Sequence, residues 1–123
     1  MEICIKSKQI YEEHEDEIIE NHVAEIIYLD EGFKMIYDDT SLYFDGESLS
    51  LTKTNMNLEI KVGSRCTSKV TTPYGDIPLD VEGKDINFCK TPFKFDVRYL
   101  IKIGNTKEYI NELQIYDTCQ IAI

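Results

Sequence analysis

The feature of this sequence that most constrains its fold is a long alternation of apolar and polar residues in the last third of the chain. Every odd position from Phe93 to Ile103 is apolar, and every even position is charged except Leu100. A period of two residues places alternate side chains on opposite faces of a β-strand. Gly104-Asn105 favours a tight turn, and a second strand follows from Thr106 to Tyr116. We therefore predict a long hairpin with one dry face, which the rest of the chain must cover.

Shorter segments of the same kind fill most of the remaining chain, and Gly, Pro, Asn and Asp separate them at turns. The expected strands are Glu2–Gln9, His22–Asp30, Phe33–Tyr37, Leu42–Phe44, Ser48–Lys53, Asn55–Val62, Arg65–Thr72, Ile77–Glu82 and Ile86–Phe88. Consecutive short hairpins favour a barrel, because a sheet that closes on itself leaves no bare edge. We predict an all-β fold, an antiparallel up-and-down barrel of about eight to ten strands, as a single domain over residues 1–123.

Residues Tyr11 to Asn21 do not follow the alternation of apolar and polar residues that is typical of β-strands. This segment contains six acidic residues, and Ile18-Ile19 is its only apolar pair. A short helix and a solvated loop fit the segment equally well, since repulsion between neighbouring carboxylates weakens a helix.

The charge of the chain restricts its partners. Its net charge is −10, so most of the surface repels nucleic acids and anionic membranes. No apolar run approaches the roughly 18 residues that a membrane-spanning helix requires, and the first residues lack the layout of a signal peptide. The four cysteines show no Cys-x-x-Cys spacing and are interpreted as reduced thiols. We expect a cytoplasmic protein that binds neither nucleic acid nor membrane.

Residues that could perform catalysis or hold a metal are few and scattered. His14 lies among carboxylates, but neighbouring acidic residues in one segment seldom converge on one ion. Asp38-Asp39 and Asp45-Gly46-Glu47 lack the pattern of a calcium-binding loop and are explained as turns. Cys66 follows Arg65 and is interpreted as an ordinary strand cysteine. We expect no catalytic residue, no metal and no cofactor.

Four residues are candidates for contacting a ligand. Arg65 begins a strand at a turn, where the mouth of a barrel lies, and with Lys69 it could clamp an acidic ligand through hydrogen bonds. Tyr43 and Tyr99 could line the barrel interior as amphipathic wall residues, although a place in the packed core is the favoured interpretation for both.

Two segments also resemble a known family. The run TTPYGDIPLDVEGKDINF (Thr71 to Phe88) and the hairpin FKFDVRYLIKIGNTKEYINELQIY (Phe93 to Tyr116) are similar to the YwiB-like family of small bacterial calycin-like proteins. The motif-like element is the turn Thr72-Pro73-Tyr74-Gly75, which precedes a strand, a short strand and one long terminal hairpin. The resemblance implies a closed or nearly closed antiparallel barrel of lipocalin-like shape, with an unassigned role and an unassigned ligand.

These observations favour a non-enzymatic protein that binds a small apolar or amphipathic molecule in the barrel interior, because such a barrel can hold a cavity. The alternative is a protein-interaction or self-assembly module with a packed core, such as a homodimer formed through an exposed strand edge. A hydrolase or isomerase has the least support, since no acid–base pair can be identified in the sequence.

Overall fold

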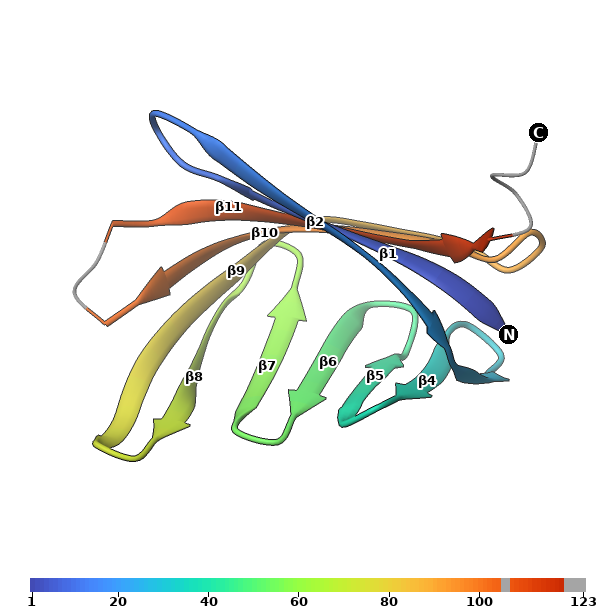
Figure 1. Ribbon diagram of the computed structural model, residues 1–123, viewed down its shortest axis with the longest axis horizontal. Helices are drawn as coiled ribbons and strands as arrows, with labels where there is room; N and C mark the ends of the chain where they lie inside the picture. Colours follow the sequence, from blue (N-terminus) through green and yellow to red (C-terminus); the bar gives the residue numbers. More distant parts are fainter. Residues whose placement is uncertain (105–106, 119–123) are drawn as a thin grey trace.

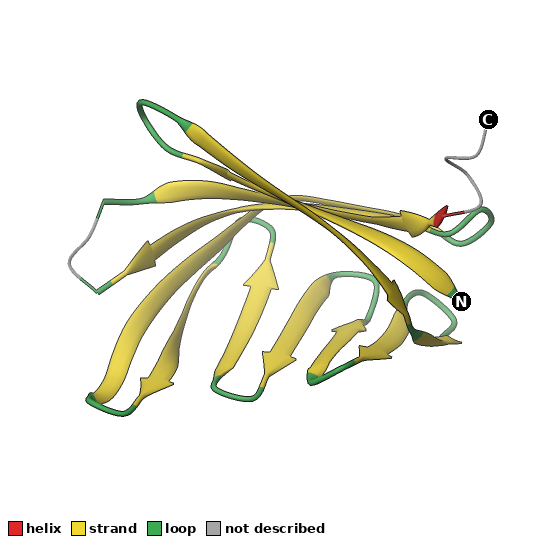
Figure 2. Cartoon of the chain, viewed as in Figure 1, coloured by secondary structure: helices red, strands yellow, loops and turns green. Residues whose placement is uncertain are grey.

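The computed structural model describes residues 1–104 and 107–118, and these form eleven strands in one antiparallel sheet (Figure 1, Figure 2). The strands are β1 (Glu2–Ile10), β2 (Glu15–Val23), β3 (Glu25–Tyr28), β4 (Phe33–Tyr37), β5 (Thr40–Phe44), β6 (Ser48–Lys53), β7 (Met56–Lys61), β8 (Arg65–Thr72), β9 (Gly75–Cys89), β10 (Lys94–Ile103) and β11 (Tyr109–Asp117). Their order is β2-β1-β11-β10-β9-β8-β7-β6-β5-β4-β3, and the sheet curls into a nearly closed barrel. No helix among the described residues is long and apolar enough to cross a membrane.

The two edge strands of this sheet are consecutive in the chain. β2 ends at Val23 and β3 begins at Glu25, so only Ala24 separates the two edges. Ala24 is buried; its N–H donates to the carbonyl oxygen of Met1 at 2.9 Å, and its own carbonyl oxygen accepts from the N-terminal ammonium at 3.0 Å. This corner closes one end of the barrel and divides the predicted strand His22–Asp30 into two. The other end of β2 diverges from the strands opposite and leaves the barrel open there (Figure 1).

A cluster of aromatic rings fills the interior at the closed end. Alternation along each strand turns one face inward, and the buried side chains are almost all aliphatic or aromatic. Phe33 is completely buried at the centre of the cluster. Its ring centroid lies 5.0 to 6.0 Å from those of four other rings: Phe44, Phe88, Phe93 and Phe95.

The long hairpin predicted from the alternation is present as β10 and β11. The two strands pair continuously from Lys94↔Tyr116 to Ile101↔Tyr109. Gly104 has a positive φ of 57°, which glycine adopts at little cost. Asn105 of the predicted turn and Thr106, the predicted start of the second strand, lie outside the described residues. The inward side chains of β10 are buried, as the alternation predicts: Phe95, Val97, Tyr99 and Ile101.

The prediction of a short helix or loop over Tyr11–Asn21 is wrong, because most of this segment belongs to β2. The strand pairs with β1 over its whole length. Pairing places the Lys8 Nζ atom 3.1 Å from the Glu15 carboxylate and the Lys6 Nζ atom 3.7 Å from the Glu17 carboxylate. Opposite charges across the ladder offset the repulsion that weakens a helix. This additional strand is one reason why the described chain has eleven strands and not the predicted eight to ten.

β9 is one strand of 15 residues, where the sequence predicted two short strands and a turn. The residues Gly83-Lys84-Asp85 form a bulge, and the register with β10 shifts between Arg98 and Tyr99. Gly83 is required here, since an added Cβ atom would lie 2.7 Å from the Lys61 carbonyl group. The close approach of a neighbouring turn therefore explains the glycine that looked like a strand boundary.

Phe33→Ala should destabilise the protein strongly, because it removes the ring at the centre of the aromatic cluster. We expect the free energy of unfolding to fall by about 3–5 kcal/mol in urea denaturation followed by circular dichroism. Tyr74 lies 100% exposed at the tip of the β8–β9 hairpin and provides the control. Tyr74→Ala should change the same quantity by at most about 0.5 kcal/mol. Equal losses in the two variants would contradict the central position of Phe33.

Candidate functional site

A cavity of about 390 Å³ lies inside the barrel toward its open end. We call it the barrel cavity. One side of its lining comes from β1, β2, β10 and β11, and the opposite side comes mainly from β6, β7 and β8. Most lining side chains are apolar, among them Leu51, Met56, Leu58, Val70, Ile101 and Leu113. A concave, mostly apolar site with a few polar groups is the usual form of a small-molecule pocket.

Three polar side chains lie in one row on one side of the barrel cavity, and we call this row the polar wall. It consists of Gln9 of β1, Asn111 of β11 and Tyr99 of β10. The sheet register explains the row, because Asn111 is paired with Gln9 on one side and with Tyr99 on the other. Directly paired residues project from the same face of a sheet. All three side chains therefore point into the barrel.

The polar wall contains a buried acceptor without a partner. The Asn111 Nδ2 atom donates a hydrogen bond to the Tyr99 hydroxyl oxygen. The Asn111 Oδ1 atom is buried and accepts no hydrogen bond from any described residue. Such an unsatisfied group costs about 1–3 kcal/mol in a folded protein. A donor on a bound molecule would remove this cost, so the polar wall offers an anchoring point for a ligand.

Burial makes the polar wall unfavourable for negative charge. The Tyr99 side chain is only 4% exposed. Burial raises the pKa of its hydroxyl to about 12, although the hydrogen bond from Asn111 acts in the opposite direction. Burial also raises the pKa of Tyr37 and of Tyr109, which line the same cavity. At neutral pH these hydroxyls are uncharged, and each can donate and accept hydrogen bonds.

Charged side chains that line the barrel cavity lie at its mouth. Among the described lining residues, the charged ones are Glu20 of β2 and Lys53 of β6, and both are exposed. Ile18 of β2 also turns toward the cavity, yet it is 57% exposed because no strand covers that edge of the sheet. The mouth is therefore bounded on one side by an edge strand that pairs only with β1.

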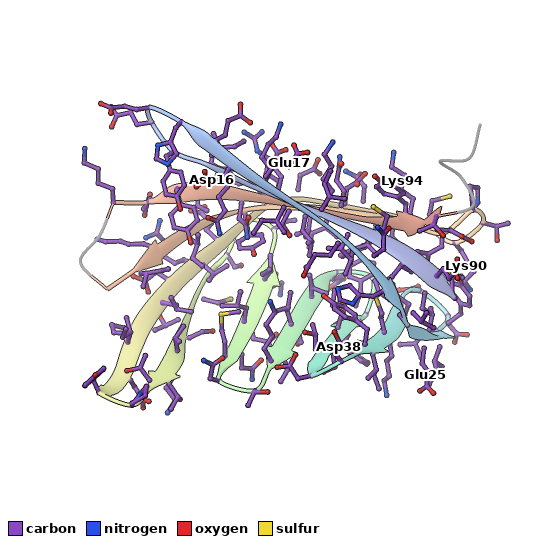
Figure 3. All side chains as sticks on the ribbon, in the orientation of Figure 1. Asp16, Glu17, Glu25, Asp38, Lys90 and Lys94 are labelled. Atoms are coloured by element: carbon purple, nitrogen blue, oxygen red, sulfur yellow. The ribbon has the colours of Figure 1, made fainter. Side chains whose placement is uncertain are left out.

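His22 connects this edge strand to the turn between β4 and β5. Its ring centroid lies 4.6 Å from that of Tyr37, and its Nδ1 atom lies 3.4 Å from Oδ2 of Asp38. Figure 3 labels Asp38 in the turn between β4 and β5. Its Nε2 atom lies 3.8 Å from Glu20 Oε1. Since Tyr37 and Glu20 both line the barrel cavity, these contacts position the two sides of its mouth.

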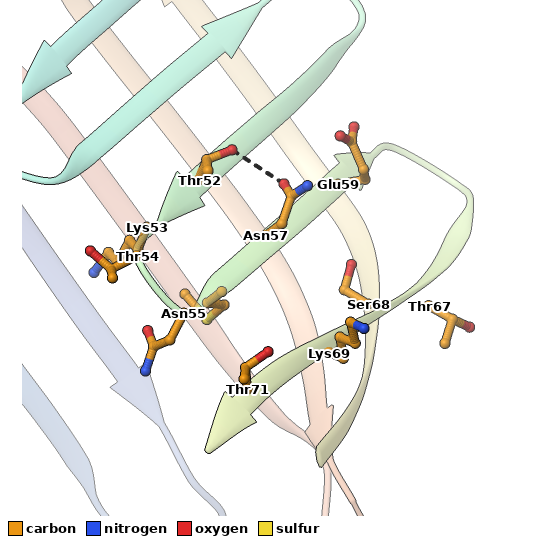
Figure 4. Close-up of a pocket in the computed structure, with 11 residues that line it drawn as sticks. Thr52, Lys53, Thr54, Asn55, Asn57, Glu59, Thr67, Ser68, Lys69 and Thr71 are labelled. Atoms are coloured by element: carbon orange, nitrogen blue, oxygen red, sulfur yellow. Dashed lines mark hydrogen bonds between the residues drawn. The ribbon is translucent and has the colours of Figure 1, made fainter. Parts of the chain in front are cut away.

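A second hollow lies on the surface where β7 and β8 diverge (Figure 4). The described ladder between these strands has two pairs, Met56↔Val70 and Asn57↔Lys69. The resulting groove measures about 620 Å³ and is lined largely by hydroxyl, amide and charged groups. One of its hydroxyls, on Thr52, donates to Asn57 Oδ1 at 3.3 Å. Because this groove is open and polar, the barrel cavity is the stronger candidate for a small-molecule site.

The structure separates the four residues predicted to contact a ligand. Tyr99 lies in the polar wall. Arg65 and Lys69 occupy the outward positions of β8, and each is paired with carboxylates outside the barrel. The Arg65 Nη2 atom lies 3.0 Å from Glu108 Oε1, and the Lys69 Nζ atom lies 3.2 Å from Asp76 Oδ2. The two cations therefore do not meet at the barrel cavity.

Tyr43 also lies outside the cavity. It is 42% exposed, between the buried residues Leu42 and Phe44, and Lys34 Nζ lies 5.3 Å from its ring centroid. The alternation of β5 turns Tyr43 outward, just as that of β8 turns Arg65 and Lys69 outward.

The acidic residues do not assemble a metal site in the described part of the chain, where no three His, Cys, Asp or Glu side chains are grouped to hold an ion. His14 stacks on Tyr11 with ring centroids 4.5 Å apart, and its Nε2 atom lies 3.7 Å from Asp16 Oδ2. Asp45 accepts two backbone hydrogen bonds of 2.8 Å within its own turn, and these bonds lower the pKa of its carboxyl. Free thiols are found at Cys4, Cys66 and Cys89, and Cys119 lies outside the described residues.

Sequence reasoning missed Asn111 and Gln9. Asn111 occupies an inward position of β11, between Tyr109 and Leu113 in the alternation. An amide at a position where the pattern calls for an apolar residue is a usable signal, because a buried amide requires partners. Gln9 has no such signal of its own, since only the pairing of β1 with β11 places it beside Asn111.

Tyr99→Phe should reduce the loss of stability at alkaline pH. The pKa of Tyr99 is about 12 in the folded protein and about 10 in the unfolded chain. The unfolded chain therefore releases this proton first, so the free energy of unfolding falls as the pH rises from about 10 to about 12. This difference is worth about 3 kcal/mol at the upper limit.

We expect the urea midpoint of Tyr99→Phe to fall less than that of the wild type between about pH 8 and about pH 11. Tyr43→Phe makes the same chemical change outside the barrel and should follow the wild type. If both variants followed the wild type, the assignment of Tyr99 to a buried wall would be wrong.

Comparisons with known proteins bear on the fold. No protein-family model matches this chain, and no curated protein matches it. Among solved structures, the chain is similar to the crystal structure of ywiB protein from Bacillus subtilis, with a TM-score of 0.63 and 12% sequence identity. The similarity covers 94% of this chain and 89% of that chain. At this identity the likeness concerns the fold alone, and the two proteins share it over nearly their whole lengths.

Proposed function

We propose that this protein is a non-enzymatic, cytoplasmic binding protein that takes a small apolar or amphipathic molecule into the barrel cavity. The observation that carries the proposal is the cavity of about 390 Å³, whose lining is mostly apolar and includes the polar wall. Pockets for small molecules measure about 300–1,000 Å³ and combine apolar walls with a few placed polar groups.

The cost of leaving this space unfilled supports the proposal. Cavities in a protein core are destabilising, and larger side chains at the lining positions would reduce the empty volume. The closed end of the barrel shows that this chain packs aromatic rings densely where it uses them. The barrel cavity instead combines aliphatic side chains with the unpartnered acceptor of Asn111. Features that reduce stability in this way are expected at functional sites.

We also propose that the chain belongs to the YwiB-like family of bacterial calycin-like proteins. The fold shared with the Bacillus subtilis protein supports this proposal, as does the turn Thr72-Pro73-Tyr74-Gly75. In that turn the Thr72 hydroxyl accepts from the Tyr74 N–H at 3.2 Å and donates to the Gly75 carbonyl oxygen at 2.6 Å. The turn therefore depends on threonine and on glycine with a positive φ of 118°.

A self-assembly module is the second candidate function, and the exposed edge of β2 favours it. Ile19 and Val23 are exposed on this strand, and a bare edge can pair with another chain. Light scattering distinguishes the candidates: a monomer supports the binding protein, whereas a dimer that Ile19→Lys converts to monomers supports the module.

Val70→Trp should block ligand binding, because Val70 lines the barrel cavity and an indole ring there would occupy much of its volume. We expect the affinity for the neutral dye N-phenyl-1-naphthylamine, measured by fluorescence titration, to fall by at least about tenfold, as expected from the loss of roughly 1.4 kcal/mol or more of binding energy. Lys69→Trp is the matched control, since the neighbouring residue points outward. Unchanged binding in Val70→Trp, or a loss in Lys69→Trp alone, would show that the dye does not occupy the barrel cavity.

A further inference from the structure

Two neighbouring residues of the polar wall, Asn111 and Tyr99, present one hydrogen-bond acceptor and one donor side by side. The oxygen of the third residue, Gln9, accepts from the Tyr11 hydroxyl at 3.0 Å. The Asn111 Oδ1 atom is buried without a partner. The neighbouring Tyr99 hydroxyl accepts from Asn111 Nδ2, and no described acceptor takes its own proton. We propose that the ligand of the barrel cavity carries an uncharged hydroxyl group, which donates to Asn111 and accepts from Tyr99. This inference rests on the proposed function and specifies the ligand class.

The complementarity holds for either orientation of the Asn111 amide. If the amide were rotated by half a turn, its oxygen would accept the Tyr99 proton. Its nitrogen and the Tyr99 oxygen would then be the free donor and the free acceptor. A hydroxyl group satisfies both arrangements because it donates and accepts. An ether or a carboxylate can only accept, so it leaves the second group of the wall unsatisfied.

The electrostatic environment also disfavours an anionic head group at the polar wall. Lys53, the cation among the described lining residues, is exposed at the mouth, and Glu20 lies at the mouth as well. The cations Arg65 and Lys69 are paired with carboxylates outside the barrel. The chain has a net charge of −10, and the raised pKa of Tyr99 reflects how poorly this wall accommodates a negative charge. A carboxylate placed here would be desolvated without a counter-ion.

The opposite side of the cavity determines the chemistry of the rest of the ligand. Apart from Lys53 at the mouth, the side chains there are apolar, and Leu51, Leu58 and Val70 represent three adjacent strands. These side chains offer dispersion contacts and no hydrogen bonds. The ligand class is therefore an aliphatic alcohol or a related lipid-like molecule with one hydroxyl group.

Three molecules of similar length test this assignment: octan-1-ol, its isomer 1-methoxyheptane, which can only accept, and octanoate. Each is titrated into 15N-labelled protein at neutral pH, and the dissociation constant is taken from the amide resonances of residues that line the barrel cavity. We expect octan-1-ol to bind about tenfold more tightly than either of the others, as expected for one unsatisfied buried group. The side-chain amide resonance of Asn111 should shift most with the alcohol.

Two variants test whether the preference for octan-1-ol comes from the polar wall or from apolar contacts alone. Asn111→Leu should reduce the preference of octan-1-ol over 1-methoxyheptane to about onefold, since the acceptor is lost. Gln114→Leu replaces an outward amide of the same strand and should leave the preference unchanged. If Asn111→Leu fails to fold, as judged from the dispersion of its amide spectrum, the order of the three dissociation constants in the wild-type protein tests the assigned hydroxyl group.

The outcomes distinguish this inference from the function on which it rests. Binding of 1-methoxyheptane or octanoate in the barrel cavity as tightly as octan-1-ol would overturn the assigned head group and leave the binding protein standing. Failure of all three molecules to shift any resonance of the cavity lining would overturn the proposed function together with the inference.

Discussion

Because β2 and β3 are the two edges of one sheet and only Ala24 lies between them, the chain itself closes the barrel at this corner. The buried alanine and its two hydrogen bonds to Met1 hold the corner in place. Neighbouring strands in a twisted sheet rotate by roughly 20–25° relative to one another. A strand that is anchored at one end and unpaired along one edge therefore diverges from the strands opposite it. The open end of the barrel follows from this connectivity.

The two ends of the barrel differ in the side chains that occupy them. Near the corner, Phe33 and the four phenylalanine rings around it fill the interior. Toward the open end, leucine, isoleucine and valine take the inward positions, and Asn111 and Tyr99 interrupt them. Aliphatic side chains reach less far than aromatic rings across a barrel whose walls diverge. The filled end holds the densely packed aromatic cluster, and the hollow end can therefore depart from optimal packing.

The alternation of apolar residues was sufficient to predict the β-class, the hairpin of β10 and β11, and several strand boundaries, because periodicity is a local property. It failed for β2, where the cross-strand lysines Lys6 and Lys8 stabilise the acidic residues. It also failed at Gly83. The close contact of Gly83 with Lys61, like the lysine contacts of β2, joins different strands and leaves no trace in a local pattern. The ligand contacts assigned to Arg65 and Lys69 ignored the alternation of β8, which by itself turns both residues outward.

The acidic side chains of β2 affect how accessible the mouth of the barrel cavity is. An unpaired edge with exposed isoleucines would normally invite another strand, and charged side chains on edge strands oppose such pairing. Lysines of β1 pair with Glu15 and Glu17 on the outer face of the sheet, while Asp16 and Glu20 project from the opposite face. If another strand paired with this edge, it would lie across the mouth of the barrel cavity, beside Ile18 and Glu20. In the proposed binding protein, charges that oppose such pairing would also leave the mouth of the barrel cavity accessible.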